Sequence, residues 1–221
     1  MSIAENLNKI KNSLPEEVTL VAVSKTKPSS DILEAYSTGH RDFGENKVQE
    51  MVSKWEELPR DIRWHMIGHL QRNKVKYMAE FVHLIHAVDS LRLLAEIDKQ
   101  GKRYRRVIDC LLQLRIAREE TKFGLQAQEI RDILSGEAFG QMDNVRVVGL
   151  MGMATFTEDE NQLSEEFTSL QQLYRELAPQ YGFHTLSMGM SGDYPIALEH
   201  GSNMVRVGSS IFGARNYTTN N

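Results

Sequence analysis

Residues 20–28 read Leu-Val-Ala-Val-Ser-Lys-Thr-Lys-Pro, and this stretch decides the fold. Its first four residues are all apolar, whereas a strand with one solvated face alternates apolar and polar side chains. Parallel strands that are covered on both faces have this composition. The polar turn that follows contains no glycine, and Pro28 keeps the next helix from beginning early. We therefore expect a buried parallel strand that leads into a turn with Lys25 and Lys27.

The same order of elements repeats along the chain: a short apolar run, a polar or glycine-containing turn, and a segment compatible with a helix. We expect strands at residues 18–24, 41–44, 64–68, 82–88, 107–116, 145–151, 184–188 and 204–208. Helices are expected near residues 29–38, 45–57, 71–80, 90–100, 126–135, 160–178 and 193–200. One more amphipathic helix is expected over the first fourteen residues, before Pro15, because apolar side chains recur there at helical spacing, at Ile3, Leu7, Ile10 and Leu14.

This pattern predicts the α/β class, as a single (β/α)8 TIM barrel with an extra N-terminal helix, in one domain over residues 1–221. The alternative is a doubly wound open sheet, which uses fewer strands and has its glycine-rich phosphate loop after the first strand. In this sequence the glycine-rich turns follow the seventh and eighth expected strands instead. Their position favours the barrel.

The composition narrows the class of protein and its surroundings. With 41% hydrophobic and 25% charged residues, the chain is typical of a globular protein, and its net charge of -4 argues against a nucleic-acid partner. The single cysteine, Cys110, lies in an apolar stretch, as expected in the reducing cytoplasm. No signal peptide or transmembrane stretch is recognisable, so we expect a cytoplasmic protein without a membrane partner. Neither the basic cluster at 99–106 nor Trp55 defines an interface, and we expect a monomer.

Lys25 is the first candidate for chemistry. The C-terminal ends of the strands form the active-site face of a barrel, and apolar surroundings would lower the pKa of a lysine there and free its amine to form an imine. By position alone, a strand-end lysine that reaches into solvent is the simpler interpretation. Lys27 competes with Lys25, because strand parity cannot separate the two when both faces are apolar.

Two late turns predict a phosphate site. Residues 189–193 read Gly-Met-Ser-Gly-Asp, and residues 208–213 read Gly-Ser-Ser-Ile-Phe-Gly. Barrels often bind phosphate with the loops after strands seven and eight and the N-terminus of a short extra helix. Glycine lets backbone N–H groups approach a phosphate, and serine adds hydroxyl donors. Arg206, between two valines on the last strand, needs a partner if it points inward, and an ion pair with a barrel carboxylate is the alternative to a ligand.

Other polar residues allow more than one interpretation. Asn46 follows the second strand and suits either a helix N-cap or a place in the barrel mouth. His65 and His69 are four residues apart, and His83 and His86 three, but no recognisable set of metal ligands surrounds them, and we expect no metal. No Gly-x-Ser-x-Gly motif of a nucleophilic serine occurs.

Several motifs together resemble the pyridoxal phosphate homeostasis protein family, over nearly the whole chain and in family order. They are Val-Ser-Lys-Thr-Lys-Pro at 23–28, Phe-Gly-Glu-Asn at 43–46, Trp-His-Met-Ile-Gly at 64–68, Leu-Ser-Met-Gly-Met-Ser at 186–191 and Val-Arg-Val-Gly-Ser-Ser-Ile-Phe-Gly at 205–213. Lys122-Phe123-Gly124 also fits, whereas His69 stands where many members have proline. The family is similar to the N-terminal barrel of alanine racemase and lacks that enzyme's β-domain.

The resemblance implies a cofactor and a set of binding residues. Pyridoxal 5'-phosphate would be held as a Schiff base on Lys25, not Lys27, with Arg206 against its pyridine nitrogen. The residues expected around the phosphate are Ser191, Gly192, Gly208 and Ser209. Asn46 would sit near the lysine, and Met151 would help to line the pocket.

The same chemistry favours a carrier over an enzyme. An arginine leaves the pyridine nitrogen unprotonated, which makes the ring a weaker electron sink. Racemisation needs acid–base groups on both faces of the substrate, and in the racemase one comes from the missing domain. Tyr194 is the nearest replacement, and packing against the barrel explains it better.

We therefore expect a non-catalytic protein of pyridoxal phosphate homeostasis, with the cofactor and apo forms of pyridoxal-phosphate-dependent enzymes as its partners. The alternatives are a low-activity amino-acid racemase with the same cofactor and a barrel that binds phosphorylated sugars without an imine.

Overall fold

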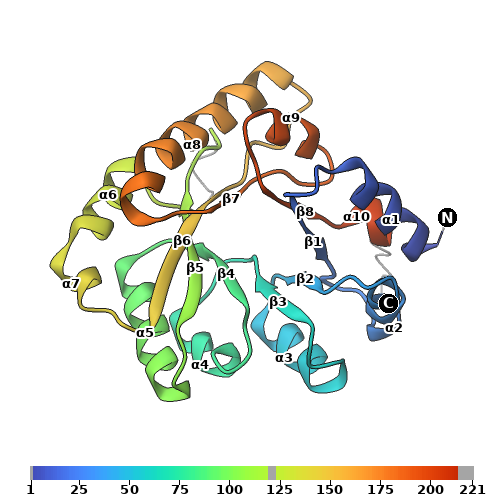
Figure 1. Ribbon diagram of the computed structural model, residues 1–221, viewed down its shortest axis with the longest axis horizontal. Coiled ribbons are helices and arrows are strands. Elements are labelled where there is room, and N and C mark those ends of the chain that lie inside the picture. Colours follow the sequence, from blue (N-terminus) through green and yellow to red (C-terminus); the bar gives the residue numbers. More distant parts are fainter. Residues whose placement is uncertain (1, 119–122, 214–221) are drawn as a thin grey trace, which may run out of the picture.

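Eight parallel strands close into a barrel in the computed structural model of the protein, which describes residues 2–118 and 123–213 (Figure 1). They follow one another around the ring in chain order, and β1 pairs with both β2 and β8. The strands are β1 Thr19–Val23, β2 Asp42–Glu45, β3 Arg63–Met66, β4 Leu84–Val88, β5 Ile108–Leu114, β6 Val145–Gly152, β7 Thr185–Ser187 and β8 Met204–Val207. The expected (β/α)8 barrel is confirmed.

Helices surround this ring on the outside (Figure 1). They are α1 Ile3–Ser13, α2 Ser29–Ser37, α3 Val48–Glu57, α4 Val75–Met78, α5 Leu91–Tyr104, α6 Ala127–Ser135, α7 Glu137–Gly140, α8 Glu160–Tyr181, α9 Tyr194–Glu199 and α10 Ser209–Phe212, with a 3-10 turn, η1, at Arg72–Lys74. The helix expected over 71–80 is thus divided into η1 and α4. The sequence did not predict helices at α7 and α10, because segments this short cannot show a helical period.

Alternation along the strands divides the apolar core into two layers. Leu20 and Ala22 of β1 belong to the layer between strands and helices, whereas Val21 belongs to a cluster inside the barrel. On β8 the same alternation puts Met204 inside and Val205 outside. The interior is therefore filled with side chains, as in other barrels of this size.

The expected N-terminal helix is α1, and it covers the place where the barrel closes. Ser2 and Glu5 form a capping box, in which Ser2 Oγ accepts from Glu5 N at 3.2 Å and Ser2 N donates to Glu5 Oε2 at 2.8 Å. The helix lies beside α10 in Figure 1, and Asn6 Nδ2 donates to the Ile211 carbonyl at 3.1 Å. The first helix and the last therefore pack together next to β1 and β8. Among the described helices, none has both the length and the hydropathy needed to cross a membrane.

Candidate functional site

A cavity of about 1220 Å³ opens at the C-terminal ends of the strands. This is the face on which barrels carry their active sites, and the volume is ample for a small ligand. Every site residue expected from the sequence, except Met151, lines it, namely Lys25, Asn46, Ser191, Gly192, Arg206, Gly208 and Ser209. The fold thus brings together residues from the first, second, seventh and eighth strand ends.

Met151 does not line the cavity. It is completely buried in the cluster inside the barrel, together with Val148 and Leu111. The strand β6 continues to Gly152, past the expected end at residue 151, so that Met151 is still a strand residue within the barrel. Met153 lines the cavity instead.

Asn46 lies at the cavity and is not the N-cap that its residue type also suggested. The helix α3 begins at Val48, and Lys47 holds the cap position without a side-chain hydrogen bond. Asn46 is therefore one residue too early to cap the helix, and its place among the lining residues agrees with the second interpretation.

The turn with Lys25 has an unusual backbone. β1 ends at Val23, so Lys25 lies just beyond the strand, half-buried at the cavity. The turn is closed by Lys27 N, which donates to the Ser24 carbonyl at 3.0 Å. Thr26 has a φ of 63°, in the left-handed region that β-branched residues rarely adopt. This backbone conformation costs roughly 1–3 kcal/mol of folding free energy, so contacts with the surrounding residues must hold the turn in place.

Lys54 of α3 stabilises this turn through hydrogen bonds from its side chain. Its ammonium donates to the Ser24 carbonyl at 2.9 Å, to Glu45 Oε1 at 2.8 Å and to Glu50 Oε1 at 2.7 Å. The Lys54 side chain is only 8% exposed, and that of Glu45 is fully buried. Ser24 Oγ donates to the same Glu45 oxygen at 2.6 Å. The residue before Lys25 is therefore fixed through both its carbonyl and its side chain.

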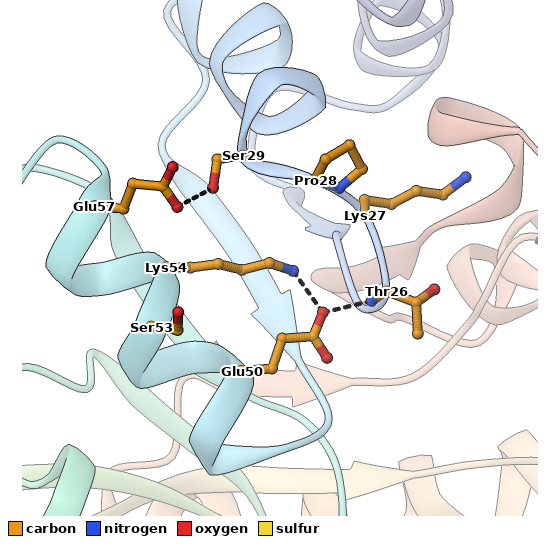
Figure 2. A pocket seen from close by; sticks show the side chains of 8 residues that line it. All are labelled: Thr26, Lys27, Pro28, Ser29, Glu50, Ser53, Lys54 and Glu57. Atoms are coloured by element: carbon orange, nitrogen blue, oxygen red, sulfur yellow. Dashed lines mark hydrogen bonds and ion pairs between the residues drawn. The ribbon is translucent and has the colours of Figure 1, made fainter.

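Lys54, Glu45 and Glu50 form one polar cluster, and this cluster also fixes the residue after Lys25. Thr26 N donates to Glu50 Oε1 at 2.6 Å, the oxygen that also accepts from Lys54, and Figure 2 shows this carboxylate between the two donors. Lys27 extends away from the cluster in that view, and its Nζ donates to the Phe212 carbonyl at 2.8 Å. One buried ammonium and two carboxylates thus hold the backbone on both sides of Lys25.

The buried position of Glu45 disfavours the charge on its carboxyl group. Burial raises the pKa of its carboxyl to about 7, and this effect outweighs the ammonium of Lys54 and the hydroxyl of Ser24, which lower it. Its second oxygen, Oε2, is buried without a hydrogen-bond partner among the described residues. The charge on Glu45 therefore depends on Lys54 remaining in place.

The two glycine-rich turns meet at the other side of the site. Ser191 Oγ accepts from Gly208 N at 3.2 Å, which ties the turn after β7 to the turn after β8. Gly189 has a φ of 96°, and a Cβ there would meet the Tyr194 Cα at 2.9 Å, so only glycine fits. Ser209 and Ser210 line the cavity and form the first turn of α10, where backbone N–H groups lack acceptors within the helix. These N–H groups suit an anion.

Arg206 is the buried cation at the cavity. It follows Met204 on the inner face of β8, and only 3% of its surface is exposed. Nη1 donates to Ser187 Oγ at 2.5 Å, and Nη2 donates to the Gly152 carbonyl at 3.0 Å. Burial lowers the pKa of Arg206 to about 10, against the carboxylate of Asp193, which raises it. The guanidinium thus remains protonated at neutral pH, and it can only donate hydrogen bonds.

His69 lies apart from His65, although the two are four residues apart in the sequence. His69 Nδ1 lies 3.2 Å from Asp89 Oδ2, and its ring stacks on Phe123 at 3.9 Å between centroids. Lys122, before Phe123, lies outside the described residues.

His65, His83 and Asp42 offer three possible metal-ligand atoms within 4.8 Å of one another. However, Arg63 already donates to both oxygens of Asp42, at 2.7 and 2.5 Å. A cation at this cluster would therefore have to compete with the guanidinium of Arg63.

The sequence contains a signal for Lys54, although Lys54 was not among the predicted site residues. Val48, Met51 and Lys54 are the buried residues of α3, and they follow one another at intervals of three. A lysine on the apolar stripe of a helix needs a buried partner, and Glu45 provides it.

The family described as alanine racemase, N-terminal domain, matches residues 1–216. The pyridoxal phosphate homeostasis protein of Escherichia coli K12 is 37% identical, with 98% of either chain covered. The protein of the same name from Aquifex aeolicus is 39% identical, over 90% of this chain and 87% of its own.

Solved structures agree with the sequence relatives. PipY of Synechococcus elongatus, solved with pyridoxal phosphate bound, superposes with a TM-score of 0.87 at 35% identity, over 96% of this chain and 100% of its own. An alanine racemase of Clostridium difficile superposes at 0.77 with 14% identity, over 98% of this chain and 58% of its own, and shows the fold alone. The chain belongs to the alanine racemase N-terminal domain family and, within it, to the pyridoxal phosphate homeostasis proteins.

Proposed function

We propose that the protein binds pyridoxal 5'-phosphate as an imine on Lys25 and takes part in cytoplasmic homeostasis of this cofactor, without robust catalysis. The observation that carries the proposal is a single cavity lined by the half-buried Lys25, the buried Arg206 and the linked turns around Ser191 and Gly208. In this proposal the protein acts as a monomer and supplies the cofactor to apoenzymes.

The residues fit the three reactive parts of the cofactor. Its phosphate requires several donors, and the first turn of α10 offers the N–H groups of Ser209 and Ser210. Its pyridine nitrogen is an acceptor, and Arg206 is a donor that cannot become an acceptor. Its aldehyde condenses with a lysine amine to an imine, with release of one water, and Lys25 lines the same cavity.

Two features support a carrier. Pyridoxal phosphate supplies an electron sink when its ring nitrogen is protonated, and Arg206 favours the unprotonated nitrogen. Tyr194, the nearest candidate for a second acid–base group, packs against the layer between strands and helices. Among the described residues, the cavity lining contains no tyrosine. A reversible imine without a tyrosine as the second acid–base group suits storage and release.

The test is chemical trapping. The purified protein is loaded with pyridoxal phosphate, reduced with borohydride and digested, and the modified peptide is identified by mass spectrometry. We expect the adduct on Lys25. An adduct on Lys27, or on no lysine, would contradict the proposal. Sustained turnover of an amino acid by the loaded protein would instead establish an enzyme.

Arg206→Glu tests the contact with the ring. A carboxylate at this position favours a protonated pyridine nitrogen, so we expect the absorption band of the bound cofactor to shift. Arg146→Glu is the control, because Arg146 pairs with Asp109 at the start of β6, away from the cavity lining. An unchanged spectrum with the cofactor still bound to the Arg206 variant would rule out the assigned contact.

A further inference from the structure

A row of buried polar side chains crosses the inside of the barrel from Arg206 to Asp42. Arg206 Nη1 donates to Ser187 Oγ at 2.5 Å, and Ser187 Oγ lies 3.1 Å from His86 Nδ1. His86 Nε2 lies 3.0 Å from His65 Nδ1, and His65 Nε2 lies 3.1 Å from Asp42 Oδ1. The five residues come from β8, β7, β4, β3 and β2, and each is at most 8% exposed.

The two ends of this row set the direction of its hydrogen bonds. Asp42, as a carboxylate, can only accept, so a neutral His65 must carry its proton on Nε2. His65 Nδ1 is then an acceptor and must receive the Nε2 proton of His86. His86 Nδ1 is in turn an acceptor and must receive the Ser187 hydroxyl proton.

The arginine end requires the same direction. The guanidinium of Arg206 can only donate, so Ser187 Oγ accepts from it while its own proton points to His86. The opposite direction would need a doubly protonated His65 next to Asp42.

Electrostatics at both histidine and carboxylate agree with this assignment. Burial is the main reason that the pKa of His86 lies well below its ordinary value, and the charge of Arg206 adds to this effect, so His86 is neutral. Burial alone would raise the pKa of Asp42, but hydrogen bonds from Arg63 and His65 hold it well below 3.8. Asp42 is therefore a carboxylate, and Arg63 compensates its charge at the opposite end of the strands from the cavity.

We infer that Ser187, His86, His65 and Asp42 form a one-directional hydrogen-bond relay that positions the guanidinium of Arg206 at the cavity. Hydrogen bonds in such a chain polarise one another, and a hydroxyl that donates to His86 becomes a better acceptor for Arg206. The four residues are positioning residues that act through Arg206. The relay rests on the proposed function only where it names pyridoxal phosphate as the ligand of Arg206.

The direction of the relay is measurable without any cofactor. Long-range proton–nitrogen NMR correlations of the histidine rings distinguish the two neutral tautomers from the imidazolium, and the spectra of His65→Gln and His86→Gln assign the signals. We expect both rings as neutral Nε2–H tautomers at neutral pH. An Nδ1–H tautomer or an imidazolium at either residue would overturn the relay.

The effect on Arg206 is tested with Asp42→Asn against a matched control. Asp109→Asn removes a carboxylate from a similar bidentate pair, with Arg146 at 2.7 and 2.9 Å, that lies outside the relay. We expect Asp42→Asn to weaken pyridoxal phosphate binding by about three- to thirtyfold and to shift the spectrum of the bound cofactor. Asp109→Asn should leave affinity and spectrum unchanged.

Ser187→Ala provides a second variant, in which Arg206 keeps the Gly152 carbonyl as an acceptor, so the test does not depend on the folding of Asp42→Asn. It removes the acceptor of Arg206 directly, and the same spectral shift is expected. If both variants bind with unchanged affinity and spectrum, the relay does not position Arg206. If the unaltered protein binds no pyridoxal phosphate, the proposed function fails, while the histidine tautomers still decide the direction of the relay.

Discussion

Replacement of Lys25 by alanine is expected to abolish the borohydride-stable adduct and the absorption band of the protein-bound imine. The donors of Arg206 and of the turns after β7 and β8 remain, so the variant should still bind pyridoxal phosphate reversibly. Because the covalent bond no longer contributes, we expect the dissociation constant to rise by at least about tenfold, or 1.4 kcal/mol. Equilibrium dialysis measures this affinity, and mass spectrometry after reduction measures the adduct.

Lys27→Ala is the matched control for this experiment. Lys27 lines the same cavity two residues away, and its Nζ donates to the Phe212 carbonyl at 2.8 Å. Its removal should loosen α10 but leave the adduct on Lys25. If Lys25→Ala retains a full adduct and Lys27→Ala loses it, the two lysines have been assigned in the wrong order.

Lys54→Met is expected to destabilise the fold by about 3–5 kcal/mol, because the buried Glu45 must then either take up a proton or keep a charge without its partner beside Glu50. Glu45 is fully buried and Glu50 is 23% exposed, so water replaces the lost ammonium poorly. The same change frees the Ser24 carbonyl, and we expect less adduct on Lys25 at equal cofactor concentration. Urea unfolding gives the free energy, and trapping gives the yield.

Lys99→Met separates this effect from the loss of any lysine. Lys99 pairs with Glu96 at 3.8 Å and is 74% exposed, so its loss should cost less than about 1 kcal/mol. A second background, Lys54→Met with Glu45→Gln, should recover part of the stability because a neutral amide needs neither a counter-charge nor the uptake of a proton. If Lys54→Met costs no more than Lys99→Met, the buried cluster does not stabilise the turn.

The barrel was predictable because short apolar runs without alternation recur along the chain, each followed by a turn and a helix-compatible segment. The expected strand at 204–208 agrees with β8, Met204–Val207, and both glycine-rich turns lie at the cavity. The side chains inside the barrel were not predictable, since a strand that is apolar on both faces does not show which residues point inward. The register places Leu84 opposite His65, and this puts His86, two residues on, within reach of that ring. No spacing within the sequence relates these two histidines.

The position of Lys25 and Arg206 at the cavity was predictable, because each lies at or near the C-terminal end of a barrel strand. The site was not predictable where the exact end of a strand decides which side chain reaches the cavity. Met151 and Met153 have the same type and similar neighbours, and only the end of β6 at Gly152 separates the buried methionine from the one at the cavity.

The pairing of β1 with β8 closes the ring between the first and last strands, and this seam spans nearly the whole chain. Contacts between such distant segments carry the largest loop-closure entropy, so the seam is a weak point kinetically. A ligand held by the turn after β1 and by the turns after β7 and β8 would contact both sides of this seam. Mass action then stabilises only the closed chain, in proportion to ligand concentration. Resistance to proteolysis should therefore increase with the ligand concentration around the protein. The lifetime of the protein would then depend on the supply of its ligand.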